Sequence, residues 1–219
     1  MIYICGDSFC TSDKDYPEIQ PWNERLNDTV NLAQVCASNL LISLQVDRAI
    51  KNQADYIIVS FTSVTRAEIK YKEENNNKEL LDRFYSLTRE NNNSYDLTTL
   101  TIWNSKDAKA LTDEQRQLID EYNKQFFDLD LAIYKDSLII ENTLQRLVDS
   151  GIPFKFDQGG FEHSSYGGVR SYFTKFDQYR SKLNLWDYAD TRTHRPYFHI
   201  TDNSIHKQVA EYYYNEINS

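Results

Sequence analysis

Long apolar runs are missing from this chain. It contains no stretch of about 18 consecutive apolar residues, the length that a membrane-spanning helix requires. The segment from Met1 to Asp7 has neither a basic start nor an extended apolar run, so it predicts a core strand and not a signal peptide. We therefore expect a cytoplasmic protein with no membrane partner.

Cysteine and histidine are scarce. The chain has three cysteines (Cys5, Cys10 and Cys36) and four histidines, and neither set shows the spacing of metal ligands. We therefore expect no metal and no cofactor. An odd number of cysteines without a disulfide pattern is typical of a reducing cytosol.

Positive charge is also in short supply. Lysine and arginine total 24 against 33 acidic residues, which gives a net charge of −9 at pH 7. Duplex nucleic acid is bound largely through Lys and Arg on phosphates, so this balance argues against a nucleic-acid partner. A length of 219 residues with 40% hydrophobic side chains suits one domain and is small for two. We predict a single domain over residues 1–219.

Short apolar strands alternate with helical segments along the chain. Strands are predicted at residues 2–5, 30–33, 56–62 and 153–157, and helices at 38–52, where Ser38 or Asn39 is the cap, at 112–150 and from 204 onward. The strand at 56–62 is apolar on both faces, as in the centre of a parallel sheet. This alternation predicts a three-layer α/β/α protein with a parallel sheet. Ligands of such sheets bind at the carboxyl ends of the strands, where the strand order reverses.

The stretch at about 69–110 has a different character. Runs of asparagine at 75–77 and 91–93 flank a helix-like piece around Leu80 to Leu87. We interpret this stretch as a helical insertion in the domain, acting as a mobile cap or as the contact of a homo-oligomer.

Four blocks of residues carry the functional signal. They are Gly6-Asp7-Ser8-Phe9 directly after the first strand, Asn31-Leu32-Ala33 with Ala37-Ser38-Asn39, the segment from Asp55 to Arg66, and His199 with the segment from His206 to Ala210. In this order they resemble the SGNH/GDSL hydrolases, especially the phage and bacterial branch of that family. The resemblance covers residues 1–68 and 190–217, and the middle of the chain is not diagnostic.

The resemblance implies a flavodoxin-like three-layer fold and an esterase or acetylesterase. A serine hydroxyl becomes a good nucleophile when a base takes its proton. By resemblance, Ser8 is the nucleophile and His199 is the base. The alternatives are a turn serine that caps the following helix and a structural histidine at a strand end. For His206 we favour a packing role.

Two blocks depart from the family pattern. No Asp stands three residues before any His, so the acid that orients the base is left open between Asp190, Asp187 and Asp202, or is absent. The oxyanion hole also differs, because Cys36 stands near the usual glycine and Thr62 or Ser63 replaces the usual asparagine. A backbone amide at Cys36, a hydroxyl at Thr62 or Ser63, or the amide of Asn39 is the candidate donor.

Further polar residues lie on the predicted edge of the sheet. Arg66 is a candidate for binding an anionic or carbonyl group of the substrate, or else forms an ion pair with Glu68 or another acid. Glu162 and His163 are most simply solvated loop residues. Cys10 is most simply a buried thiol, although a cysteine nucleophile is conceivable.

Three functions follow from these observations. The first is a serine esterase acting on a small-molecule or carbohydrate acyl ester, the carbohydrate being suggested by sixteen Tyr and three Trp. The second is an SGNH-fold binding or interaction protein whose catalytic residues have eroded. The third is a flavodoxin-like nucleotide or phosphate binder, which Asp7 disfavours because it sets an acid where phosphate would bind.

Overall fold

The computed structural model describes most of the chain. The described residues are 1–12, 17–35, 37–64, 66–70, 97–101, 113–158, 169–183, 185–188 and 200–218. Among the helices within these ranges, none is long and apolar enough to cross a membrane.

A parallel sheet of four strands forms the centre of the domain. Its strands are β1 (Ile2–Cys5), β2 (Thr29–Asn31), β3 (Tyr56–Ser60) and β6 (Phe154–Asp157), in the order β2-β1-β3-β6. β1 pairs with both β2 and β3, so that Ile2 lies opposite Thr29 on one side and Tyr56 on the other. The predicted α/β class with a parallel sheet is therefore confirmed. The order reverses between β1 and β3, which makes the carboxyl ends of these two strands the expected ligand edge.

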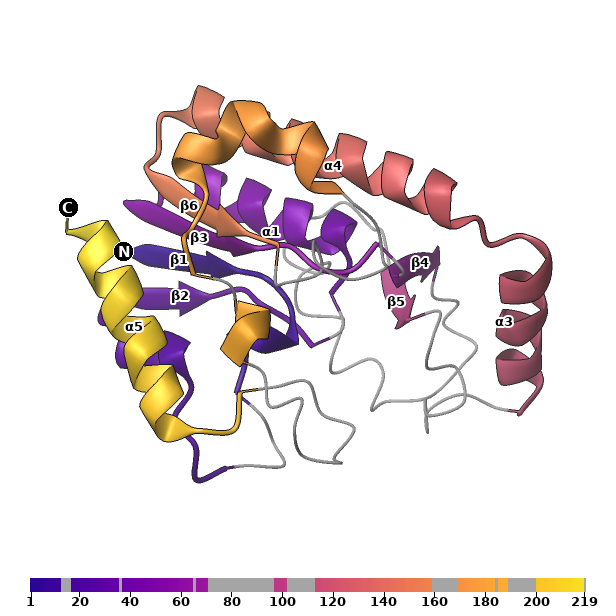
Figure 1. Cartoon of the computed structure of the whole chain (residues 1–219), viewed down its shortest axis with the longest axis horizontal. Helices are drawn as coiled ribbons and strands as arrows, with labels where there is room; N and C mark the ends of the chain where they lie inside the picture. The colour runs from indigo at the N-terminus through magenta and orange to yellow at the C-terminus, as the bar shows by residue number, and fades with distance from the viewer. Residues whose placement is uncertain are drawn as a thin grey trace.

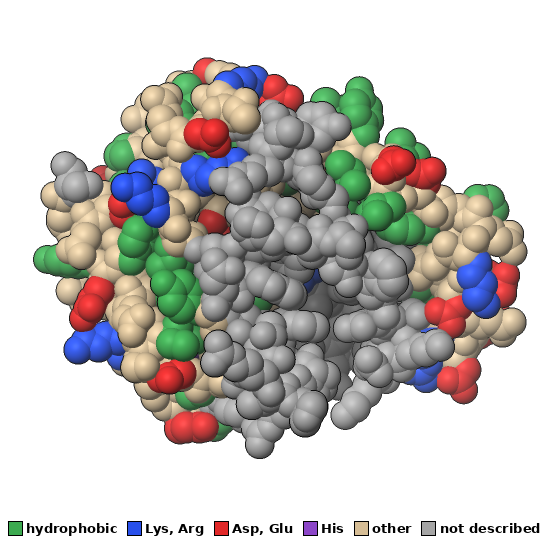
Figure 2. Space-filling view, in the orientation of Figure 1, with side chains coloured by type: hydrophobic (Ala, Val, Ile, Leu, Met, Phe, Trp, Pro, Cys, Tyr) green, Lys and Arg blue, Asp and Glu red, His purple; other side chains and the backbone are tan. Residues whose placement is uncertain are grey.

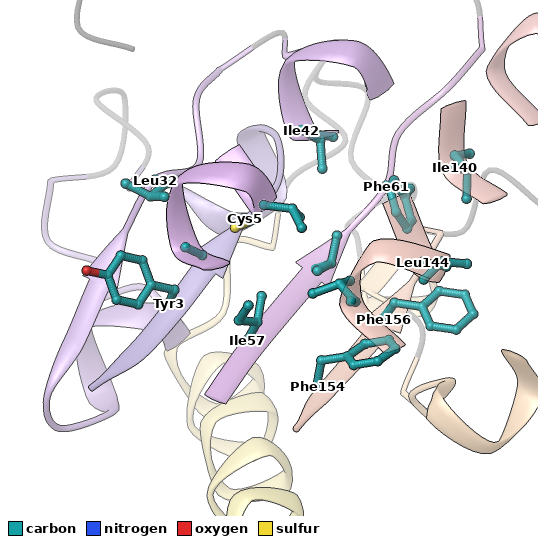
Figure 3. Close-up of a cluster of buried hydrophobic side chains, with 14 of the residues drawn as sticks. Tyr3, Cys5, Leu32, Ile42, Ile57, Phe61, Ile140, Leu144, Phe154 and Phe156 are labelled. Carbon is teal, nitrogen blue, oxygen red and sulfur yellow. The ribbon is translucent and has the colours of Figure 1, made fainter. Parts of the chain in front are cut away.

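Helices cover both faces of this sheet (Figure 1). α1 (Asn39–Lys51) and α4 (Leu129–Ser150) pack on one face, and α5 (Asn203–Ile217) packs on the other with the short 3-10 helix η2 (Trp22–Arg25). Alternate residues of each strand serve the two faces, because successive side chains of a strand point in opposite directions. Figure 3 shows the α1–α4 side of the core, where Ile57, Phe154 and Phe156 of the sheet meet Ile42 and Leu144 of the helices.

The helix ends follow local capping chemistry. Ser38, and not Asn39, is the N-cap of α1, and its hydroxyl accepts the backbone N–H of Leu41 at 3.2 Å. The predicted long helical region is two helices, α3 (Asp113–Gln125) and α4, because Asp128 caps a new start by accepting the N–H of Leu131 at 2.9 Å. α4 ends at Gly151, whose φ of 71° lies in the left-handed region that favours glycine.

Two strands fall in or beside the predicted insertion. β4 (Arg66–Lys70) and β5 (Leu97–Thr101) pair antiparallel, with Arg66 opposite Thr101 and Lys70 opposite Leu97. This pair of strands was not predicted from the sequence. The predicted helix around Leu80 to Leu87 lies outside the described residues, so the helical character of the insertion stays a prediction. Two 3-10 helices, η4 (Val169–Tyr179) and η5 (Leu185–Tyr188), were also not anticipated.

Large hydrophobic side chains lie exposed along α3, α4 and the turn between them, in a region where Figure 2 shows several hydrophobic patches. They are Leu118, Tyr122, Phe126, Leu131, Tyr134 and Leu138. The opposite side of α4 carries Ile140, Leu144 and Leu147, which are buried against α1 and the sheet. α4 therefore contributes to the core through one side only.

His206 joins α5 to η2. The side chain is buried, its Nδ1 accepts the backbone N–H of Trp22 at 3.1 Å, and its Nε2 lies 3.1 Å from the carbonyl oxygen of Ile200. A carbonyl oxygen only accepts, so Nε2 carries the proton and the ring is neutral. Trp22 in turn stacks on Tyr213, with ring centroids 4.9 Å apart. These contacts agree with the packing role that the sequence favoured for His206.

This burial predicts a pH-dependent stability. Burial lowers the pKa of His206 from its ordinary value of 6.5, so the folded state holds the neutral ring and the unfolded chain binds the extra proton. The contribution of His206 to stability is therefore fully present above pH 6.5. It is lost as the pH falls from that value towards the lower pKa of His206 in the folded state. We expect His206→Asn, which keeps an acceptor near Trp22, to flatten the fall between about pH 6.5 and 5. The urea midpoint of unfolding of the wild type and of the variant, measured across this pH range, tests the prediction. If the midpoints of both proteins fall equally with pH, His206 is not the cause of the fall.

Candidate functional site

Ser8 lies at the expected ligand edge of the sheet. β1 ends at Cys5, and after Gly6 and Asp7 the chain enters the 3-10 helix η1 (Ser8–Cys10). β1 is one of the two inner strands, and it flanks the point at which the strand order reverses. Ser8 is partly exposed, whereas Asp7 before it and Phe9 after it are buried. The fold therefore presents the predicted nucleophile at the surface from a tightly held turn.

Gly6 lies in a space with little room for a side chain. A Cβ atom at this position would lie 2.8 Å from Cys10 Sγ and 3.2 Å from the carbonyl oxygen of Ser60. The backbone of Gly6 is held by the buried amide of Gln45 on α1, which accepts its N–H at 2.7 Å and donates to its C=O at 3.2 Å. The glycine of the Gly-Asp-Ser block is thus required by packing, and Gln45 fixes the end of β1 relative to α1.

Asp7 is a buried carboxylate with donors from different parts of the chain. It is 1% exposed. Its Oδ1 accepts the backbone N–H of Phe9 at 3.0 Å, which caps η1, and its Oδ2 accepts the hydroxyl of Thr62 at 2.7 Å. Arg66 Nη2 lies 3.1 Å from the same Oδ2. These contacts stabilise the carboxylate and tie the turn of Ser8 to the loop after β3.

Arg66 faces into the protein. Its side chain is 11% exposed, it pairs with Asp7 through Nη2, and its Nη1 donates to the carbonyl oxygen of Ala37 at 2.6 Å. The sequence offered a substrate-binding role or an ion pair with Glu68 or another acid, and in the structure Asp7 is an acid that pairs with Arg66. A substrate-binding role for Arg66 stays a prediction, and its guanidinium would have to serve both Asp7 and the substrate.

Asn39 holds the loop after β3 in place. Its Oδ1 accepts the N–H of Thr62 at 2.9 Å, and its Nδ2 donates to the C=O of Thr62 at 3.0 Å. Nδ2 also donates to Oδ2 of Asp136, a buried residue of α4, at 2.7 Å. The side chain of Asn39 is fully buried and therefore acts in this structure as a clamp on the backbone of Thr62.

Two of the predicted oxyanion donors, Thr62 and Asn39, lie together, and both are already hydrogen-bonded within the protein. The hydroxyl hydrogen of Thr62 is donated to Asp7, and the amide of Asn39 is engaged by Thr62 and Asp136. Ser63 follows Thr62 in the same loop and is buried. Cys36 lies outside the described residues.

His199 and Asp190 lie outside the described residues, as do the side chain of Asp187 and the loop with Glu162 and His163. Asp202 is the exposed N-cap of α5, where its Oδ1 accepts the N–H of Ser204 at 2.7 Å. Hydrogen bonds from Ser204 lower the pKa of Asp202. The carboxylate of Asp202 therefore has a capping role in the structure.

A second buried carboxylate, Asp157, lies at the end of β6. Its Oδ1 accepts the hydroxyl of Ser60 at 2.8 Å and its Oδ2 accepts the hydroxyl of Tyr213 at 3.0 Å. Burial, with the charge of Asp157 nearby, raises the pKa of Tyr213 and of Cys10 well above their ordinary values. Cys10 is therefore a protonated thiol in the core, in agreement with the buried thiol that the sequence favoured.

Sequence reasoning did not single out Gln45, Asp136 or Asp157. All three are polar residues at positions that helical or strand periodicity assigns to the core, and they are buried. A polar residue on an apolar face is the signal that could have identified them, because such a residue needs a hydrogen-bonding partner when buried.

The Asp7–Arg66 pair predicts a measurable coupling. Removing one partner leaves the other charge buried and unpaired, so we expect Asp7→Asn and Arg66→Met each to lower the free energy of unfolding by about 3 kcal/mol. The double variant should lose clearly less than the sum, because neither charge is then left behind. Urea unfolding of the four proteins closes this double-mutant cycle. Losses that add within about 0.5 kcal/mol would show that the two side chains are not coupled.

Comparisons of the chain with protein-family models, with curated proteins and with solved structures find no match.

Proposed function

We propose that this chain is a serine hydrolase of the SGNH/GDSL type, with a flavodoxin-like arrangement of its parallel sheet. The observation that carries the proposal is the position of Ser8. It follows Gly6 and Asp7 at the carboxyl end of an inner strand, beside the reversal of strand order, and it is partly exposed between buried neighbours. Residues from the first three sequence blocks, Asp7, Asn39 and Thr62, are joined there by hydrogen bonds.

In the proposed reaction, Ser8 attacks the carbonyl carbon of an acyl ester. His199 takes the hydroxyl proton and later returns it to the departing alcohol, after which water releases the acid from the enzyme. Ile200, the residue after His199, is buried in the same hydrophobic cluster as Phe9, the residue after Ser8. This supports His199 as the base. Because Asp202 already caps α5, Asp190 and Asp187 are the stronger candidates for the orienting acid.

The oxyanion needs donors that face the carbonyl oxygen of the substrate. The backbone amides of Ser8 and Cys36 are the donors that we propose, because the side chains of Thr62 and Asn39 are already hydrogen-bonded to Asp7 and Asp136. The substrate that we propose is a small or carbohydrate acyl ester in the cytoplasm, and the Asn-rich, Gly-poor composition suggests a phage or another AT-rich genome as the source.

A second candidate function is a binding protein on the same fold. The observation that favours it is the internal use of Thr62, Asn39 and Arg66, three side chains from which the sequence predicted donors to a substrate. Such a protein would fold normally but would not turn over an ester.

Covalent labelling and ester hydrolysis separate the two functions. We expect the purified protein to hydrolyse p-nitrophenyl acetate and to be labelled by a fluorophosphonate probe at Ser8. Ser8→Ala should lose both activities by at least about a thousandfold, because the attacking oxygen is gone, and His199→Ala should lose both because the base is gone. Ser150→Ala, near the amino end of the sheet, is the matched control and should keep full activity.

The outcomes are distinct. Loss in Ser8→Ala alone would move the base to another histidine. A folded wild type that neither turns over the ester nor reacts with the probe would reject the hydrolase and favour the binding protein.

A further inference from the structure

We infer that Asp136 is a positioning residue for the site of Ser8, acting through Asn39 on the loop that follows β3. The inference rests on the proposed function for its effect on catalysis, whereas the link from Asp136 to Thr62 can be tested by itself. Asp136 belongs to α4, is 2% exposed and is separated from Asn39 by 97 residues of sequence. It is not part of any of the four blocks that suggested the hydrolase.

The first step concerns the direction of the Asn39 amide. The two ends of this side chain are an acceptor and a donor, and they face the N–H and the C=O of the same residue, Thr62. In the reversed orientation, Oδ1 would face both the carbonyl oxygen of Thr62 and the carboxylate of Asp136, and all three atoms only accept. The carboxylate of Asp136, 2.7 Å from Nδ2, therefore favours one orientation of the amide, and that orientation is the one that clamps Thr62.

The second step leads from Thr62 to Ser8. With both backbone groups of Thr62 held, the chain beyond β3 keeps a fixed path, and the Thr62 hydroxyl donates to Asp7 at 2.7 Å. Asp7 caps η1 and directly precedes Ser8. Asp136 thus acts on the nucleophile through one amide, without contacting a substrate.

The same two helices provide a matched control. The hydroxyl oxygens of Thr143 on α4 and Ser43 on α1 lie 2.8 Å apart, and both side chains are buried. This pair resembles the Asp136–Asn39 pair in joining α1 to α4 by a side-chain hydrogen bond, but its bond is not to a residue that holds Thr62. Thr143→Val therefore perturbs the packing of α1 on α4 without loosening Thr62.

The experiment compares Asp136→Leu, Asp136→Asn and Thr143→Val with the wild type. We expect Asp136→Leu, which removes the acceptor, to lower kcat for p-nitrophenyl acetate by about ten- to a hundredfold with KM changed less than about threefold, because a small misplacement of catalytic groups is costly. Asp136→Asn retains an oxygen that can accept from Asn39 and should recover most of kcat. Thr143→Val should keep the wild-type kcat even if its urea midpoint falls as far. Equal losses of kcat in Asp136→Leu and Thr143→Val, or no loss in Asp136→Leu, would overturn the inference.

Amide hydrogen exchange provides a readout that does not depend on activity. The N–H of Thr62 should exchange at least about tenfold faster in Asp136→Leu than in the wild type, while the amides of β1 keep their protection, because only the clamp has opened. If Asp136→Leu does not fold, Asp136→Ser serves the same purpose with a side chain too short to bind Asn39. If the wild type is inactive but Thr62 still exchanges faster in Asp136→Leu, the proposed hydrolase function is rejected and the role of Asp136 in holding Thr62 is retained. Unchanged exchange at Thr62 would overturn the clamp whatever the activity.

Discussion

The burial of the Asp7 carboxylate is the constraint on which the ligand edge of this domain depends. An ionised carboxylate that is 1% exposed is stable only where donors replace the water that it has lost. Asp7 obtains them from its own turn through Phe9, from the loop after β3 through Thr62, and from β4 through Arg66. These three segments must therefore come together for the buried carboxylate of Asp7 to be stable. The turn that presents Ser8 is fixed as a result.

Two amide side chains extend this constraint to the helices. Gln45 holds both backbone groups of Gly6, and Asn39 holds both backbone groups of Thr62. An amide side chain has a donor and an acceptor, so it can take the place of a neighbouring strand where the sheet has ended. α1 thereby orders the residues just beyond β1 and β3, which satisfies buried backbone groups and fixes the geometry at the carboxyl edge. Asp136 adds α4 to the same arrangement.

The elements of the sheet could be predicted from sequence because their signals are local. β3 is five buried residues in a row, and the cap of α1 precedes an apolar helix. The position of Ser8 after β1 follows from the same local pattern. The polar network could not be predicted, because its partners are far apart in sequence. Nothing around Asp136 indicates Asn39, and the hydroxyl of Thr62, for which an oxyanion role was predicted, donates to Asp7.

The pairing of Arg66 with Asp7 also bears on the chemistry proposed for Ser8. Acyl transfer develops negative charge on an oxygen close to the nucleophile, and a buried anionic carboxylate one residue away would oppose that charge. Arg66 lies 3.1 Å from Asp7 and is itself largely buried, so the two charges offset each other where solvent screens poorly. An arginine that contacts no substrate can in this way still favour the transition state, by making the surroundings of Ser8 close to neutral. Arg66 can therefore contribute to the proposed reaction while its ion pair with Asp7 stays intact.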